Sequence, residues 1–308
     1  MSKLIPPRPR YAPERRIVGF AAFAAALLLF ICRLLCKKLT MLPNWLPLVP
    51  LLLSLAVLLP AAVFCLMRGK GYSKALRFKL PRAAYIPLCI CAFFAVCSGA
   101  LLLSALCDGL GTLGNTAFSF AHLESIPWWG IPLYILCCAL LPAFAEELLF
   151  RGVLAAEYER RGSFRAILLS TVCFALLHFD LKNLLAYLFV GFALSCLLYT
   201  TDSLLATVLT AGAFYTVSLF GQKHFNTLYR FTGNLQLLLF ILIFTFLISA
   251  LLFCRIAART YYKRNEYGVG EPRRAVPYAV QFYTVLDAVC DPTLIATVII
   301  AVVGIILF

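Results

Sequence analysis

Long apolar runs separated by short polar loops dominate the chain. Each run is about as long as the roughly 20-residue helix that crosses a hydrocarbon core of about 30 Å, and none alternates as a barrel strand does. We therefore expect an all-α, polytopic membrane helical bundle of eight or nine transmembrane helices, because the short C-terminal run could instead lie in the interface. The runs are Ile17–Leu35, Trp45–Met67, Tyr85–Leu106, Trp128–Val153, Phe164–Leu181, Leu184–Thr200, Ser203–Phe220, Leu235–Phe253 and Thr293–Phe308.

The composition agrees with a lipid environment. Hydrophobic residues occupy 63% of the 308 positions and charged residues 13%, whereas a soluble domain carries about 25% charged residues. The net charge of +14 comes from Lys and Arg near the ends of the runs, which predicts contact with anionic membrane lipid and no nucleic-acid binding. Most of the 13 cysteines lie inside apolar runs without CxxC spacing, so we interpret them as small buried hydrophobic residues.

Lys and Arg in the short loops predict the orientation. The basic N-terminus, the loop Arg68–Arg82 and the segment after the fourth run all fall on one side, while the loop Cys107–Pro127 contains no Lys or Arg. Lys37 and Lys38 fall on the opposite side and depart from the pattern. We expect a multi-pass protein of the cell membrane with a cytoplasmic N-terminus.

Two adjacent carboxylates, Glu146 and Glu147, lie inside the apolar run Ile131–Val153. Each charge at that depth costs roughly 2.5–3.5 kcal/mol on insertion scales, so charged residues there usually mark a functional site. Arg151 follows Glu147 by one helical turn, and the two can neutralise each other. Glu146 is then the carboxylate without a local partner, in the low-dielectric surroundings that suit a general base near neutral pH.

The following run supplies His178, with Phe174 one turn before it on the same face. The turn between the two runs is expected near Arg161–Gly162. Glu146 and His178 each lie about 16 residues from that turn, and because a helix rises about 1.5 Å per residue, an antiparallel hairpin places both at the same level. The sequence therefore predicts two ionisable groups on neighbouring helices at one depth, as a water-activating site requires.

The stretch Leu140–Leu219, about a quarter of the chain, resembles the core of the CPBP family, the membrane-embedded CAAX prenyl protease 2 and bacteriocin-processing group. The resemblance implies an intramembrane endopeptidase in which the first glutamate and the histidine activate a water against a peptide carbonyl, so a peptide or protein substrate is expected. It rests on an EExxxR motif, an FxxxH motif and a glycine in the next helix, which are Glu146, Glu147 and Arg151, then Phe174 and His178, then Gly191.

These motifs define the expected site. The catalytic group is Glu146 and His178, with Glu147 and Arg151 holding the first carboxylate in place. Side chains expected to contact the substrate are Phe150, Phe174 and Tyr215.

The third family motif, HxxxN, is replaced here by Ala211 and Tyr215. Ala211 has no polar atom, whereas the Tyr215 hydroxyl could donate one hydrogen bond to an oxyanion. The remaining histidines, His122 and His224, fall outside the motif positions, and zinc sites need three or four ligands. We therefore expect a metal-free, glutamate-based mechanism without a cofactor.

Two other functions remain open. Loss of the third motif favours a catalytically impaired family member that acts as a membrane binding or regulatory protein, and Arg255–Asp291 is a candidate docking loop. A transporter with a Glu146–His178 proton relay is the least favoured, because no inverted repeat is present. The expected divisions are N-terminal helices at 1–125, the family-like core at 126–222, and C-terminal helices with a cytoplasmic loop at 223–308. The sequence does not indicate an oligomeric state.

Overall fold

A computed structural model describes residues 15–39, 48–69, 72, 74–108, 130–159, 162–232, 235–266 and 278–308. All regular secondary structure in these ranges is helical, with no strand among them. The all-α prediction is therefore confirmed. The basic N-terminal segment and most of the loop Cys107–Pro127 lie outside the described residues, so the orientation in the membrane stays a prediction.

Every apolar run of the sequence forms a helix or a series of helices. Six helical segments in the described residues are long and apolar enough to cross a membrane, and three shorter apolar helices accompany them. The polytopic membrane bundle is confirmed, and the number of spans stays a prediction. Besides the fourth run, the helices are α1 (Arg15–Leu39), α2 (Leu48–Arg68), η2 (Ala83–Tyr85), α3 (Ile86–Asp108), α7 (Ser163–Leu176), α8 (Leu184–Thr201), α9 (Leu204–Thr232), α10 (Leu235–Glu266), α11 (Tyr278–Val289) and α12 (Pro292–Leu307).

The fourth run is one continuous rod interrupted by two π-helical turns. Pro142 stands in the first turn of its middle segment and has no N–H to donate to the preceding turn, so a regular α-helical ladder cannot continue there. π-turns inside α-helices are rare and occur frequently at functional sites. The successive segments are α4 (Ile131–Ile135), η5 (Leu136–Leu140, π), α5 (Leu141–Glu147), η6 (Leu148–Leu154, π) and α6 (Ala155–Glu159).

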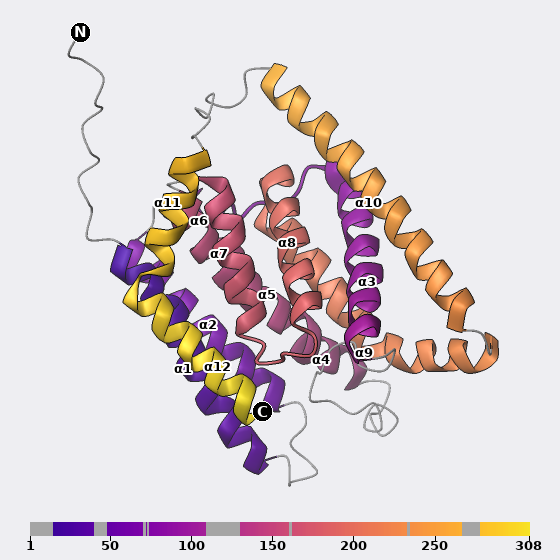
Figure 1. Ribbon diagram of the computed structural model, residues 1–308, viewed down its shortest axis with the longest axis horizontal. Helices are drawn as coiled ribbons and strands as arrows, with labels where there is room; N and C mark the ends of the chain where they lie inside the picture. Colours follow the sequence, from indigo (N-terminus) through magenta and orange to yellow (C-terminus); the bar gives the residue numbers. More distant parts are fainter. Residues whose placement is uncertain are drawn as a thin grey trace.

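The helices form three groups, and the carboxylate-bearing rod belongs to the middle group. In Figure 1, α1, α2 and α12 lie together on one side, α3 and α10 on the other, and α5, α7 and α8 between them. The approach of α1 to α12 is close, because a Cβ on Gly19 would lie 1.7 Å from Oγ1 of Thr293. The two ends of the described chain therefore pack against each other beside the central helices.

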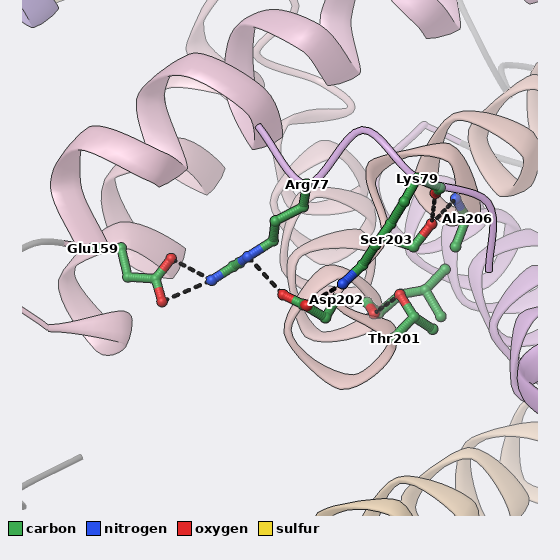
Figure 2. Close-up of polar contacts among 8 residues, drawn as sticks. Arg77, Lys79, Glu159, Thr201, Asp202, Ser203 and Ala206 are labelled. Atoms are coloured by element: carbon green, nitrogen blue, oxygen red, sulfur yellow. Dashed lines mark hydrogen bonds and ion pairs between the residues drawn. The ribbon is translucent and has the colours of Figure 1, made fainter. Parts of the chain in front are cut away.

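An ion-pair clamp fixes the loop after α2 to the ends of α6 and α8 (Figure 2). Nη2 of Arg77 donates to both carboxylate oxygens of Glu159, at 2.8 and 2.6 Å, and Nε lies 2.8 Å from Oδ1 of Asp202. Lys79 pairs with the second oxygen of Asp202, and the Ser203 hydroxyl donates to the Lys79 carbonyl. The clamp holds the carboxylate-bearing rod and α8 at a fixed relative position.

Candidate active site

The predicted pair of Glu147 and Arg151 is present and buried. Nη1 of Arg151 lies 2.7 Å from Oε1 of Glu147, and the two side chains are 0% and 1% exposed, respectively. The second guanidinium nitrogen donates to the carbonyl of Gly191 at 3.0 Å. The guanidinium also lies 4.4 Å from the centre of the Phe174 ring, a cation–π contact. The pair thus neutralises two buried charges and ties the η6 turn to α8.

Glu146 uses its two oxygens differently. Oε2 accepts a hydrogen bond from the Tyr215 hydroxyl of α9. Oε1 faces Nε2 of His178 at 4.0 Å, and the side chains of Glu146 and His178 are 19% and 16% exposed, respectively. A carboxylate and an imidazole from neighbouring rods therefore face each other at a point that is accessible from outside the protein.

The surroundings of His178 determine which ring nitrogen carries the hydrogen. Nδ1 lies 2.7 Å from the backbone carbonyl of Phe174, and because a carbonyl only accepts, Nδ1 must donate. The neutral imidazole then has its lone pair on Nε2, the nitrogen that faces Glu146. The ring stacks on Tyr187 of α8, with centroids 4.0 Å apart, and meets the Phe174 ring edge-on at 4.6 Å.

The level expected for Glu146 and His178 agrees with the structure. The rod that ends at Glu159 and helix α7, which begins at Ser163, meet around Gly162, where φ is +136°. One detail differs from expectation, because α7 ends at Leu176 and His178 lies in the turn that follows. Outside the helical ladder, the imidazole can bond back to the preceding turn and present its other nitrogen to the carboxylate.

Phe150 and Phe174 lie behind the site. Each is 1% exposed, and their rings pack edge to face with centroids 5.3 Å apart. Phe174 in turn contacts the Arg151 guanidinium and the His178 ring. Tyr215, the third residue expected to contact the substrate, is directed to Glu146 by its hydrogen bond. Substrate contact by these three side chains stays a prediction.

The two residues that replace the third motif, Ala211 and Tyr215, differ in their relation to the site. Ala211 is 2% exposed, and the neighbouring Thr210 hydroxyl donates to the carbonyl of Ala206 at 2.8 Å. Tyr215 alone of the replaced residues therefore reaches the carboxylate. His122 and the side chain of His224 lie outside the described residues.

Sequence reasoning missed Tyr187 and Arg33. Tyr187 lies one helical turn before the motif glycine Gly191, on the same face of α8. The position of Gly191 therefore indicates the face of α8 on which a residue that contacts His178 could have been found. Arg33 of α1 places its guanidinium over the ring of Phe179, 5.1 Å from the centroid. Its approach to the site arises from long-range packing.

No metal centre is apparent in the described part of the chain, where no three side chains of His, Cys, Asp or Glu gather in positions to hold an ion. Glu146 and His178 would supply two ligands at most from this arrangement, and Glu147 is committed to Arg151. The expectation of metal-free chemistry stays a prediction.

The segment that carries the site is similar to a known protein family. The family described as type II CAAX prenyl endopeptidase Rce1-like matches residues 127–214. Residues 127–214 are therefore similar to this family of endopeptidases. The match contains the two carboxylates, Arg151, His178 and Tyr187, whereas Arg33 and α10 to α12 lie outside it.

A relative supports the same assignment. A Bacillus subtilis (strain 168) protein named "Putative membrane peptidase YdiL" is 38% identical over 68 residues, which are 22% of this chain and 28% of that protein. No solved structure matches the chain. The resemblance to the CAAX endopeptidase family thus covers the helices that carry the site, and the helices on either side of it have no counterpart in these matches.

Proposed function

We propose that the protein is an intramembrane endopeptidase of the CAAX type in which Glu146 is the general base. The observation that supports this most is the 4.0 Å separation between Oε1 of Glu146 and Nε2 of His178. This distance is too long for a direct hydrogen bond. An oxygen atom beside the line that joins them can lie about 2.8 Å from both, which is hydrogen-bond distance.

The proposed reaction places a water at that point. Oε1 of Glu146 takes one proton from the water as the water oxygen attacks the peptide carbonyl carbon. The lone pair of Nε2 of His178 accepts a hydrogen bond from the second hydrogen and so fixes the orientation of the water. The proton held by Glu146 then passes to the leaving amine as the carbon–nitrogen bond breaks. The products are a carboxylic acid and an amine, so one water is consumed for each bond that is cleaved.

The buried residues around the pair would hold it in position. Tyr215 occupies Oε2 of Glu146, so the other oxygen is the one available to a water. Arg151 connects Glu147, the Gly191 carbonyl and the Phe174 ring, and Phe174 in turn supports His178. Catalytic groups held by packed neighbours keep the geometry that the transition state requires.

The direct test is a Glu146→Gln variant of the full chain, assayed on a panel of prenylated and unprenylated peptides in defined detergent. The amide has nearly the same shape but cannot take a proton, so we expect turnover to fall by about 10²-fold or more. Asp287→Asn, which changes an exposed carboxylate of α11, is the matched control and should cleave normally. Undiminished cleavage by Glu146→Gln would exclude the proposed base.

A second candidate function is a regulatory membrane protein without catalysis, favoured by the replacement of the third motif by Ala211 and Tyr215. In that case Glu146→Gln would keep the cellular phenotype of the wild-type protein. Substitutions in the segment Arg255–Asp291, expected from the sequence to be a loop but containing the end of α10 and all of α11, would remove it instead. Complementation of a deletion strain with the two kinds of variant separates the candidates.

A further inference from the structure

Arg33 is the single charged residue in the apolar stretch Gly19–Cys36 of α1. A guanidinium in such a stretch is costly, by roughly 2.5–3.5 kcal/mol on insertion scales, and intramembrane charges are usually paired or functional. Among the described residues no carboxylate lies within ion-pair distance of it. Its close contacts are with two aromatic rings, Phe179 at 5.1 Å and Phe308 at 6.0 Å.

These contacts place Arg33 beside the candidate active site. Phe179 directly follows His178 and has a φ of +50°, and its ring lies against Arg33 of α1 and Phe308 at the end of α12. Gly304 of α12 makes room for that ring, because a Cβ there would lie 2.6 Å from Cδ1 of Phe179. The Phe179 ring thus fills the space between α12 and the guanidinium of Arg33.

The charges near Arg33 are those of the site itself. The carboxylates of Asp180 and Glu146 lie close enough for their charges to act on Arg33. Asp180 is already engaged, because Oδ1 accepts from the backbone N–H groups of Lys182 and Asn183 and Oδ2 accepts from the Asn183 side chain. Arg33 therefore adds positive charge to one side of the site without a dedicated counter-ion in the described structure.

We propose that Arg33 binds the free C-terminal carboxylate of the peptide substrate. This inference depends on the proposed endopeptidase function and adds a residue that determines specificity, from a helix outside the family match. A guanidinium presents a planar fork of N–H donors that fits a carboxylate with two parallel hydrogen bonds. Arg33 is only partly buried, so a ligand can reach its side chain. Arg33 would then favour peptides that end in a free carboxylate over peptides with a blocked C-terminus.

The test compares two peptides that differ only at the C-terminus, one with a free carboxylate and one with a carboxamide. Binding of the fluorescent peptides is measured by anisotropy on the full-length Glu146→Gln protein in a non-ionic detergent. We expect the carboxylate to bind about tenfold tighter or more, as for hydrogen bonds between charged groups. Adding Arg33→Gln should abolish that preference, and Arg33→Lys should keep part of it, because Lys retains charge without the fork.

Arg259→Gln, which removes an exposed arginine of α10, is the matched control and should leave the preference unchanged. Equal binding of the two peptides to the protein with Arg33, or a preference that survives Arg33→Gln, would overturn the proposal. The measurement also separates the two proposals, because binding does not need turnover. Where turnover is present, Arg33→Gln should raise KM for the carboxylate peptide and leave kcat nearly unchanged.

An anionic lipid headgroup offers the same chemistry as a carboxylate. Repeating the binding in mixed micelles that contain an anionic phospholipid distinguishes the two sources. A carboxylate preference that persists there supports substrate recognition. Loss of the preference in the presence of the lipid would assign Arg33 to the headgroup and contradict the proposal.

Discussion

The hydroxyl of Tyr215 donates a hydrogen bond to Oε2 of Glu146 and leaves Oε1 to face His178. The third family motif, HxxxN, has a histidine and an asparagine at the positions of Ala211 and Tyr215. The tyrosine therefore provides a different way to hold the carboxylate. The replacement supplies a hydroxyl that donates to the glutamate in place of an imidazole and an amide. It is therefore compatible with a catalytic role for Glu146.

Tyr215→Phe should lower kcat by about 10-fold or more, because the variant retains the ring and removes only the donor that orients Glu146. The fold should be preserved, so the thermal midpoint should change little in comparison with the loss of turnover. Tyr283→Phe, at an exposed ring of α11, is the control. A variant with wild-type kcat would show that the carboxylate needs no such restraint.

Glu147→Gln should destabilise the protein by about 3–5 kcal/mol, because it leaves the guanidinium of Arg151 buried without a counter-charge. Arg151→Gln should do the same for the carboxylate. The double variant should be more stable than the sum of the single effects predicts, since both charges are then removed. Unfolding midpoints of the three variants in one detergent measure the coupling, and strict additivity would contradict a direct ion pair.

Gly191→Ala should reduce activity through a shift of Phe174. The added Cβ would lie 3.1 Å from Cγ2 of Thr171 and 3.2 Å from Cδ1 of Phe174, closer than ordinary contact, and such overpacking typically costs about 1–3 kcal/mol. Because Phe174 supports both Arg151 and His178, we expect kcat to fall more than stability alone would explain. Gly191→Ala/Thr171→Ser, which removes the nearest methyl group, should recover part of the loss.

Arg77→Gln should loosen the loop between α2 and η2, since it removes the contacts to Glu159 and Asp202 in Figure 2. Limited proteolysis should cut this loop faster than in the wild type. Lys79→Gln removes a different ion pair of the same clamp, in which the lysine side chain is 56% exposed. Because this pair is more exposed to solvent, its loss should have a smaller effect. Equal protection of all three proteins would argue against the clamp.

The arrangement of Glu146, Glu147, Arg151 and His178 could be predicted because it depends on local rules. The spacing of Glu147 and Arg151 fixes their common face, and the distances from the turn at Gly162 fix the level of Glu146 and His178. Each of these follows from the rise and turn of a helix.

The positions of Arg33 and Tyr215 relative to Glu146 could not be predicted in this way. They depend on how α1 packs on α12, and how α9 packs on the η5 and α5 segments. Those packings depend on close approaches such as Gly19 to Thr293 and Gly212 to Leu140. A single sequence does not show which residue of another helix each glycine contacts. The π-turns could not be predicted either, because periodicity alone predicts one α-helix for this run, and Pro142 adjoins only the first of them.

The π-turn at Leu148–Leu154 also bears on how this site could have arisen. Such a turn is equivalent to one residue inserted into an α-helix. Deleting a single residue there would restore the regular winding and rotate everything after it by about 100° relative to Glu146 and Glu147. Arg151 would then leave the face that meets Gly191, so a chain shorter by one residue at this point would need a different anchor for its carboxylates.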